Sequence, residues 1–367
     1  MNIQLTNFFT DQLPADPNLE NTRREVLEAV YSFVRPIKTS NPTLLHVSDE
    51  MQHTLEFSNE DIQSKEFLEF VTGNSILENS KPFAMCYAGH QFGNWAGQLG
   101  DGRAINLGEI KNWAVQLKGS GPTPYSRTAD GLAVLRSSVR EYLCSEAMHH
   151  LGVPSTRALS LSLTGDQVLR DVMYNGNPAH EKGAIVSRVA KSFLRFGNFE
   201  IFAARNDLKN LKNLTDYTIK SHFSHLGKPS KEVYLQFFQE VTNKTLEMII
   251  HWQRVGFVHG VMNTDNMSIL GLTIDYGPYG WLEGFDFGWT PNTTDKQHKR
   301  YRYGNQPTIG LWNLYQLANS LYPLIEEVAP LEEILEGYKS NFEKKSQDMM
   351  RAKLGLTYAK ETDIDII

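Results

Sequence analysis

The chain has 367 residues, of which 41% are hydrophobic and 21% are charged, with a formal net charge of −6 at pH 7. This is the composition of a globular protein long enough for one large domain or two lobes. A net acidic chain lacks the basic face that general nucleic-acid binding needs, so we expect no nucleic-acid partner.

No stretch approaches the roughly 18 apolar residues that a membrane-spanning helix needs, so no membrane partner is expected. The N-terminus, Met1–Leu5, carries no basic flank ahead of an apolar run, which disfavours a secretory or transit peptide. The two cysteines, Cys86 and Cys144, lack metal-finger spacing and fit a reducing compartment. We therefore expect a cytoplasmic protein.

The first half of the chain shows both helical and strand periodicity. Apolar residues at helical spacing predict a helix over 21–34, which prolines at 36 and 42 would end. Alternating residues predict two strands over 104–109 and 113–118, joined by a short turn. A helix is predicted over 134–151, with these residues on its apolar face: Leu135, Val139, Tyr142, Leu143 and Ala147.

Further along, helical patterns take over. A strand pair is predicted at 157–173 and 184–189, then a polar helix with loops over 205–232 and a strongly apolar helix over 233–255. A β-rich part followed by an α-rich part indicates a bilobal α+β architecture with a cleft between the lobes. The long helix that leads into a loop at Val258-His259-Gly260 is typical of the second lobe of a kinase, so a protein-kinase-like fold is expected. The expected divisions are an N-terminal extension (1–80) packing on the lobes, a first lobe (81–200) and a second lobe (201–367).

Two segments carry the most specific signal. A protein kinase has His-Arg-Asp followed five residues later by Asn, and then Asp-Phe-Gly. Here His259 and Asn266 keep that spacing, and Asp275-Tyr276-Gly277 copies the triplet. Val261 stands where the catalytic Asp belongs and cannot accept a proton. The pattern indicates nucleotide chemistry that differs from ordinary phosphorylation.

Asn266 and Asp275 form the predicted metal pair, because carbonyl and carboxylate oxygens suit Mg²⁺ or Mn²⁺. Asp265 is the remaining acid in the loop and is the candidate proton acceptor. His259 is expected to support the loop. The alternative is a capped turn in which Asn266 and Asp275 bond only to local backbone.

A strand lysine and a helix glutamate form the second candidate pair. Lys118 ends the strand 113–118, and Glu141 lies in the helix that follows. A Lys–Glu pair of this kind holds the ammonium group against phosphate in kinases, which makes Glu141 a supporting residue. The alternative is that Lys118 is a solvated strand end and Glu141 a surface residue.

Glycine-rich and arginine-containing segments are weaker candidates for phosphate binding. Gly100, Gly102 and Arg103 precede the first of the two strands, where backbone N–H groups approach phosphate unhindered, although a plain tight turn is the simpler alternative.

Asp130-Gly131 indicates either a turn or a nucleotide contact. Arg188 and Arg195 lie among apolar residues, so either a phosphate or a structural carboxylate must pair with them.

Several unusual strings then point to one family. They are Ala88–Gly93, Gln98–Ala104, Gln116–Arg127, Leu135–Leu143, His259–Asp265, Ile274–Pro278 and Tyr303–Pro307. Together they closely resemble the selenoprotein O family, over roughly residues 5–325. The resemblance implies a kinase-like pseudokinase that transfers AMP from ATP to Ser, Thr or Tyr hydroxyls of proteins. It also implies a flipped ATP, with the γ-phosphate buried, and a member whose second lobe is shortened at the C-terminal end.

The resemblance also assigns roles by position. The residues that would hold ATP are Gly100, Gly102, Arg103, Lys118, Asp130, Gly131, Arg188, Arg195 and Asp275. Asn266 and Asp275 would bind Mg²⁺ or Mn²⁺, and Asp265 would take the proton of the acceptor hydroxyl. Two other functions stay open: a conventional protein kinase that uses Asp265 as its base, and an inactive nucleotide-binding pseudokinase.

Overall fold

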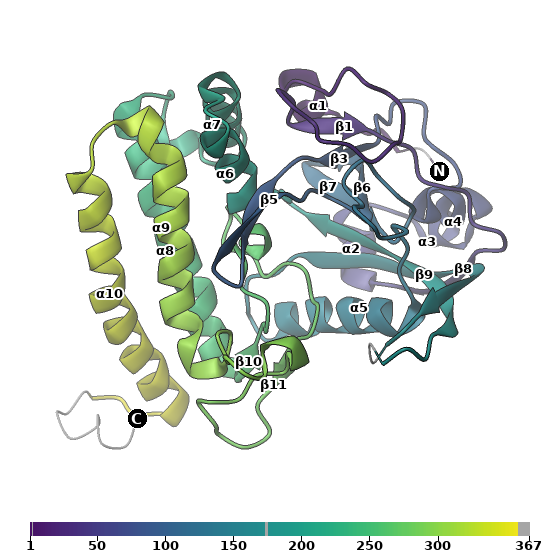
Figure 1. Cartoon of the computed structure of the whole chain (residues 1–367). Coiled ribbons are helices and arrows are strands. Elements are labelled where there is room, and N and C mark those ends of the chain that lie inside the picture. The colour runs from purple at the N-terminus through teal and green to yellow at the C-terminus, as the bar shows by residue number, and fades with distance from the viewer. Residues whose placement is uncertain (2, 173–174, 359–367) are drawn as a thin grey trace. The chain divides into compact units, whose positions relative to one another are not determined.

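The computed structural model describes residues 1, 3–172 and 175–358, which form two compact units (Figure 1). Unit 1 comprises Met1–Gly89, Ala96–Ala147 and Thr156–Phe193, and unit 2 comprises His90–Trp95, Met148–Ser155 and the chain from Leu194 onward. Unit 1 carries a large antiparallel sheet and unit 2 is mainly helical. The predicted α+β, kinase-like fold class is confirmed, and the predicted lobe boundaries at 80 and 200 stay a prediction.

Seven strands of unit 1 form one sheet in the order β1-β3-β6-β7-β9-β8-β2. Their bounds are β1 Tyr31–Phe33, β3 Phe83–Met85, β6 Ala104–Ile110, β7 Trp113–Lys118, β9 Ala179–Ala190, β8 Arg157–Arg170 and β2 Thr43–Val47. The two strand pairs predicted from alternation are confirmed as β6–β7 and β8–β9. The register places Asn106 opposite Gln116 and Gln116 opposite Arg188, so three polar residues line up across β6, β7 and β9.

Helices pack on both faces of this sheet. Each face carries its own set of side chains, because neighbouring residues of a strand point in opposite directions. Val115 and Leu117 pack in an apolar core with α4 (Lys65–Thr72). Lys118, on the opposite face of β7, reaches α5 (Leu135–His150). Shorter helices in this unit are α1 (Phe8–Gln12), α2 (Asp49–Thr54) and α3 (Asn59–Gln63).

Helix α5 confirms the helix predicted over 134–151, with one error in its apolar face. Tyr142 packs with strand residues, whereas Leu143 is 60% exposed. The buried face instead contains the polar side chains of Ser138, Glu141 and Ser145. Hydrophobicity alone misplaced this face because its polar groups have partners inside the protein.

The helix predicted over 21–34 is wrong, since the segment is irregular until β1 begins. Its backbone makes long-range hydrogen bonds in place of helical ones: Val26 N–H donates to Gln98 Oε1, and Val30 N–H donates to the Pro14 carbonyl. Glu28 adopts a φ of +56°, which interrupts any helix. The apolar spacing therefore reflects packing against unit 1.

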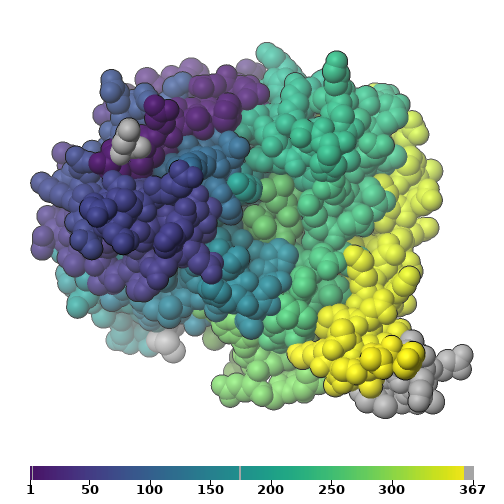
Figure 2. All heavy atoms as spheres, turned by 180° about the vertical axis from the view of Figure 1, so that it is seen from behind, coloured from purple at the N-terminus to yellow at the C-terminus, as the bar shows by residue number. Residues whose placement is uncertain are grey.

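Unit 2 contains five helices longer than eight residues within its described part. They are α6 Phe196–Ala204, α7 Leu208–His222, α8 Lys231–Val255, α9 Gln306–Ile325 and α10 Ala329–Leu354. The long helix predicted over 233–255 is confirmed as α8, which the Ser230 side chain caps and Gly256, at a φ of +69°, ends. Helices α8, α9 and α10 run side by side (Figure 1). In the view from behind, α10 is the yellow region at the edge of unit 2 (Figure 2).

The short elements of unit 2 position its loops. Strands β10 (Phe257–Val258) and β11 (Gly280–Trp281) pair on either side of the kinase-like segments. The 3₁₀ turns are η1 Ser224–Leu226, η2 Thr264–Asn266, η3 Thr293–Asp295 and η4 Tyr303–Asn305. The hairpin of β4 (Ala88–Gln91) and β5 (Asn94–Gln98) contributes residues 90–95 to unit 2. None of the helices in the described part of the chain combines the length and apolar character that crossing a bilayer requires.

Candidate active site

Buried contacts of His259 hold the loop that begins at this residue. The His259 ring stacks on Trp252 of α8, with ring centroids 5.4 Å apart. Its Nε2 donates to the Ile274 carbonyl at 2.8 Å, one residue before Asp275. His259 therefore joins the catalytic-type loop to the Asp-Tyr-Gly segment, and this contact gives it the supporting position expected from the sequence.

Asn266 ends the turn η2 and bonds within its own loop. Its Nδ2 donates to the Val261 carbonyl at 2.9 Å. The local bond that the capped-turn alternative predicts is therefore present. It also fixes the orientation of the amide, so that the side-chain oxygen is the atom left to act as a metal ligand.

Arg195 connects Asp265 with Asp275. The guanidinium forms an ion pair with Asp275 Oδ2 through Nη1, and the same nitrogen donates to the backbone carbonyl of Asp265 at 2.7 Å. Arg195 is buried, and Asp275 is partly exposed with a φ of +55°, a left-handed conformation that Asp tolerates better than most residues. A structural carboxylate thus pairs with Arg195, as one of the two sequence-based alternatives predicted.

Asp265 is the acid of the loop that begins at His259. It is 8% exposed, and this burial raises the pKa of its carboxyl to about 6, against the opposing effects of the Arg195 charge and a hydrogen bond from Gln91. Gln91 Nε2 donates to Asp265 Oδ2 at 3.2 Å. The other oxygen, Oδ1, is buried and has no hydrogen-bond partner among the described residues. A carboxylate with one oxygen held and the other unbonded is suited to accept a proton.

These donors fit a small divalent cation. Asn266 and Asp275 offer an amide oxygen and a carboxylate, and Asp265 adds a buried carboxylate beside them. Within the described ranges, no group of three or more His, Cys, Asp or Glu side chains is arranged to hold a metal alone. Mg²⁺ commonly takes only one or two protein oxygens and completes its shell with phosphate and water, so the donor set agrees with an ion that arrives with a nucleotide.

Unit 1 carries a second buried charge cluster, built around Glu141. Lys118 Nζ lies 2.6 Å from Glu141 Oε2, and Arg188 Nη1 lies 2.8 Å from Glu141 Oε1. All three side chains are buried. The structure therefore makes the predicted Lys118–Glu141 pair and adds Arg188, which the sequence had not connected with it.

A chain of amides extends this cluster across the sheet. Arg188 Nη2 donates to Gln116 Oε1, and Gln116 Nε2 donates to Asn106 Oδ1 at 3.1 Å. Asn106 Nδ2 in turn donates to Asp101 Oδ2 at 3.2 Å. Sequence reasoning missed Gln116, Asn106 and Asp101, although polar residues inside otherwise buried strands were a visible signal. Asp101 lies between Gly100 and Gly102, so the network ends in the glycine-rich segment.

The two glycines of that segment have a packing role. A side chain at Gly100, where φ is +91°, would overlap the ring of Tyr125, and one at Gly102 would lie 2.9 Å from the Tyr125 carbonyl oxygen. The tight-turn alternative therefore accounts for both residues. Arg103 has an exposed side chain, and its carbonyl accepts a hydrogen bond from Gly119 N–H.

Asp130 is paired within unit 1. Its carboxylate takes both terminal nitrogens of Arg170, at 2.7 and 2.8 Å, on the surface. Burial acts to raise the pKa of Asp130, but the hydrogen bonds from Arg170 and the Leu132 N–H outweigh it and the pKa lies below its usual value. Gly131, with a φ of +74°, leaves no room for a side chain against Gly121. The structure joins Asp130 to Arg170 and not to the Glu141 cluster.

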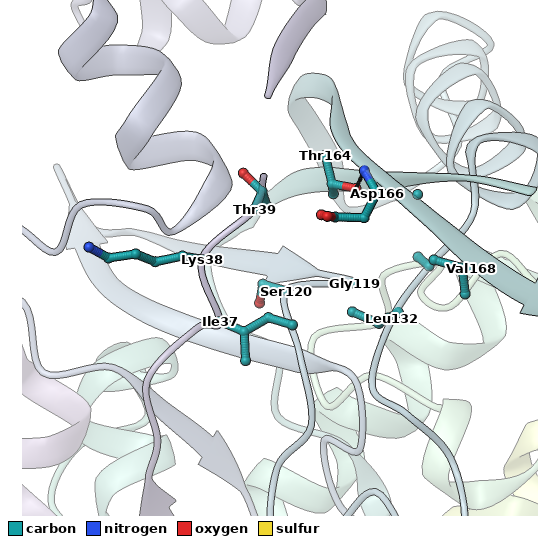
Figure 3. A pocket seen from close by; sticks show the side chains of 11 residues that line it. Ile37, Lys38, Thr39, Gly119, Ser120, Leu132, Thr164, Asp166 and Val168 are labelled. Atoms are coloured by element: carbon teal, nitrogen blue, oxygen red, sulfur yellow. Dashed lines mark hydrogen bonds between the residues drawn. The ribbon is translucent and has the colours of Figure 1, made fainter. Parts of the chain in front are cut away.

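A small cavity lies beside the turn that follows β7 (Figure 3). Its walls include Gly119, Ser120 and Leu132, with Thr164 and Asp166 from the β8–β9 hairpin. At about 120 Å³ it is smaller than the 300 Å³ or more that ligand pockets usually measure, so it is too small for a whole nucleotide. None of the predicted ATP-binding residues lines it.

The structure thus gathers the predicted residues into two clusters. Lys118, Glu141 and Arg188 meet in unit 1, and Arg195, Asp265 and Asp275 meet in unit 2, with Asn266 next to Asp265 in the chain. An α+β fold with a kinase-like loop and no acid at Val261 places the protein in the kinase-like fold class.

Comparison with known proteins identifies the family. The family described as "Protein adenylyltransferase SelO" matches residues 15–367. A protein from Flavobacterium johnsoniae named "Protein nucleotidyltransferase YdiU" is 62% identical over the whole of this chain and 71% of its own length. Proteins of the same name from Rhodopirellula baltica and Azoarcus sp. are 58% and 55% identical over 98% of this chain and 69% and 70% of their lengths. The chain belongs to the protein adenylyltransferase SelO family, so the predicted selenoprotein O resemblance and the predicted enzyme class, a nucleotidyltransferase, are confirmed.

Proposed function

We propose that this chain transfers AMP from ATP to Ser, Thr or Tyr hydroxyls of other proteins. The observation that carries the proposal is the unit 2 cluster, where Val261 replaces the usual base while buried Asp265 lies beside Asn266 and is linked through Arg195 to Asp275. Family membership supports nucleotidyl transfer to proteins.

In this proposal ATP binds flipped relative to a kinase, with the α-phosphorus toward the acceptor and the γ-phosphate buried. Lys118 and Arg188 hold phosphate oxygens, and Glu141 keeps both cations in place. Arg195 contributes a further positive charge, and Gly100, Gly102, Arg103, Asp130 and Gly131 complete the nucleotide site. Fixed cations of this kind stabilise the charge that shifts during transfer.

Asn266 and Asp275 would hold Mg²⁺ or Mn²⁺, which neutralises phosphate charge when bound. In the transfer itself, the acceptor hydroxyl oxygen forms a bond to the α-phosphorus. The bond from that phosphorus to the oxygen bridging the β-phosphate breaks, and pyrophosphate leaves. The hydroxyl proton passes to Asp265, whose unbonded oxygen is Oδ1.

Labelled ATP provides the test. With Mg²⁺ or Mn²⁺ and an acceptor protein, we expect label from the α-phosphate in protein and a mass increase equal to AMP. Incorporation of γ-label alone would instead identify a conventional kinase that uses Asp265 as its base. Thermal stabilisation by ATP without any incorporation would identify an inactive nucleotide-binding protein.

A further inference from the structure

The segment His90–Trp95 lies against the loop that carries Asp265. It forms the tip of the β4–β5 hairpin and belongs to unit 2, although most of the neighbouring chain belongs to unit 1. The segment overlaps the string Ala88–Gly93, which resembles the selenoprotein O family, and none of its residues has a role in the proposed function.

Three consecutive residues of the segment bond to three consecutive residues of the loop. The His90 N–H donates to Thr264 Oγ1 at 2.7 Å, and the Phe92 N–H donates to Asn263 Oδ1 at 3.2 Å. Between these two backbone bonds, the Gln91 side chain donates to Asp265 at 3.2 Å. The backbone bonds on either side fix where the Gln91 side chain begins.

The segment is itself held at both ends. His90 Nδ1 lies 2.6 Å from Glu200 Oε2, a buried carboxylate on α6, and the His90 ring packs edge-on to Trp312 of α9. At the other end, Tyr301 OH accepts the Phe92 N–H at 3.0 Å and donates to Asn263 Oδ1 at 2.6 Å. Contacts with α6 and α9 therefore hold the hairpin tip whose Gln91 side chain bonds to Asp265.

We propose that Gln91 is a positioning residue, which holds Asp265 Oδ2 so that Oδ1 faces the acceptor hydroxyl. The inference rests on the proposed function, since it assumes that Asp265 takes the proton. The carboxylate of an Asp side chain can rotate about its χ2 angle, and the hydrogen bond from Gln91 Nε2 to Oδ2 restrains that rotation in Asp265. Small errors in the placement of a reacting group cost large factors in rate.

The test compares Gln91→Met, which keeps the length of the side chain and removes its donor, with Asn94→Ala in the same segment. Asn94 is exposed and bonds only weakly, at 3.5 Å, to the Phe92 carbonyl. For Gln91→Met we expect kcat for AMP transfer to fall by about 10- to 100-fold, with KM for ATP within about twofold of wild type. Asn94→Ala should match wild type in both constants.

A double variant separates positioning from a general structural effect. If Gln91 acts through Asp265, adding Gln91→Met to Asp265→Asn lowers the residual rate no further. A further fall of the same size as in the single variant would overturn the proposal, as would an unchanged kcat in Gln91→Met.

Tyr301→Phe tests the same positioning role in case Gln91→Met does not fold. It removes the hydroxyl that binds both Phe92 and Asn263 and leaves the Gln91 side chain intact. We expect a severalfold fall in kcat at constant KM, with a cooperative unfolding transition by circular dichroism; an unchanged kcat would count against the proposal. Absence of α-label transfer by the wild-type chain would overturn the proposed function and this inference together, whereas wild-type transfer that does not depend on Gln91 would overturn this inference alone.

Discussion

The two buried charge clusters are built in opposite ways. In unit 1, one carboxylate, Glu141, lies between two cations, Lys118 and Arg188. In unit 2, one cation, Arg195, connects two acids by pairing with the Asp275 carboxylate and the Asp265 backbone. The three named side chains carry a formal charge of +1 in unit 1 and −1 in unit 2.

The signs of these three-residue sets agree with the proposed ligands. In the proposed function, the unit 1 cluster binds phosphate and the unit 2 cluster binds a divalent cation. Both ligands are parts of metal-bound ATP. The comparison also separates the residues that maintain each cluster from those that would act on the nucleotide, and the following variants test that separation.

The largest effect is expected for Asp275→Asn. It removes a proposed metal ligand and the carboxylate that pairs with Arg195, so transfer of α-label should fall by at least about 100-fold. Urea unfolding should also show lower stability, because the buried Arg195 guanidinium loses a carboxylate partner. Asp286→Asn, an exposed acid of the same unit, is the control and should retain activity. Full activity in Asp275→Asn would contradict the proposal that Asp275 binds a metal ion in unit 2.

In unit 1, Glu141→Gln should cost more stability than Lys118→Met. Losing Glu141 leaves two buried cations without their shared carboxylate, a change expected to cost about 3–5 kcal/mol. Losing Lys118 leaves Glu141 paired with Arg188, and methionine fills the space of the lysine stem. Both variants should use ATP poorly. Equal unfolding free energies for the two would mean that Glu141 does not organise the cluster.

A second glutamate on α5 provides an internal control. Glu146 lies on the same helix as Glu141 but pairs with Arg157, at 2.7 Å. Burial acts to raise the pKa of Glu146, but hydrogen bonds from Arg157, the Ala158 N–H and Ser48 outweigh it, so the pKa lies below its usual value.

The lowered pKa means that the unfolded chain binds the proton more readily than the folded one. Glu146 therefore contributes stability above its unfolded pKa of about 4.3, and this contribution is lost as the pH falls through the folded value. Glu146→Gln should flatten the acid side of the stability curve and leave transfer unchanged. A loss of transfer at constant stability would place Glu146 in the active site.

Asp130→Asn should have the smallest effect on stability. The Asp130–Arg170 pair is on the surface, and such pairs contribute up to about 1 kcal/mol. If the proposed ATP contact is correct, KM for ATP rises severalfold in the same variant. An unchanged KM would mean that Asp130 acts only as a turn residue, which is the alternative that its Asp-Gly sequence also suggested.

Local patterns were sufficient for several of the regular elements, although they failed at residues 21–34, and for the kinase-like loop. Alternation predicted β6 and β7, helical spacing predicted α5 and α8, and the spacing of His259, Asn266 and Asp275 predicted the kinase-like loop. These signals are local because period and spacing follow directly from strand and helix geometry.

Only the tertiary structure decided which partners the charged residues have. Arg188 joins Glu141 because β9 pairs with β7 in a register that places it opposite Gln116. Gln91 reaches Asp265, and Arg170 takes Asp130, across long stretches of chain. The sequence by itself determined most of the strongly periodic elements and which residues can carry charge or offer oxygen ligands. Their partners were decided by strand register and loop packing, since contacts between residues far apart in the chain leave no periodic signal in it.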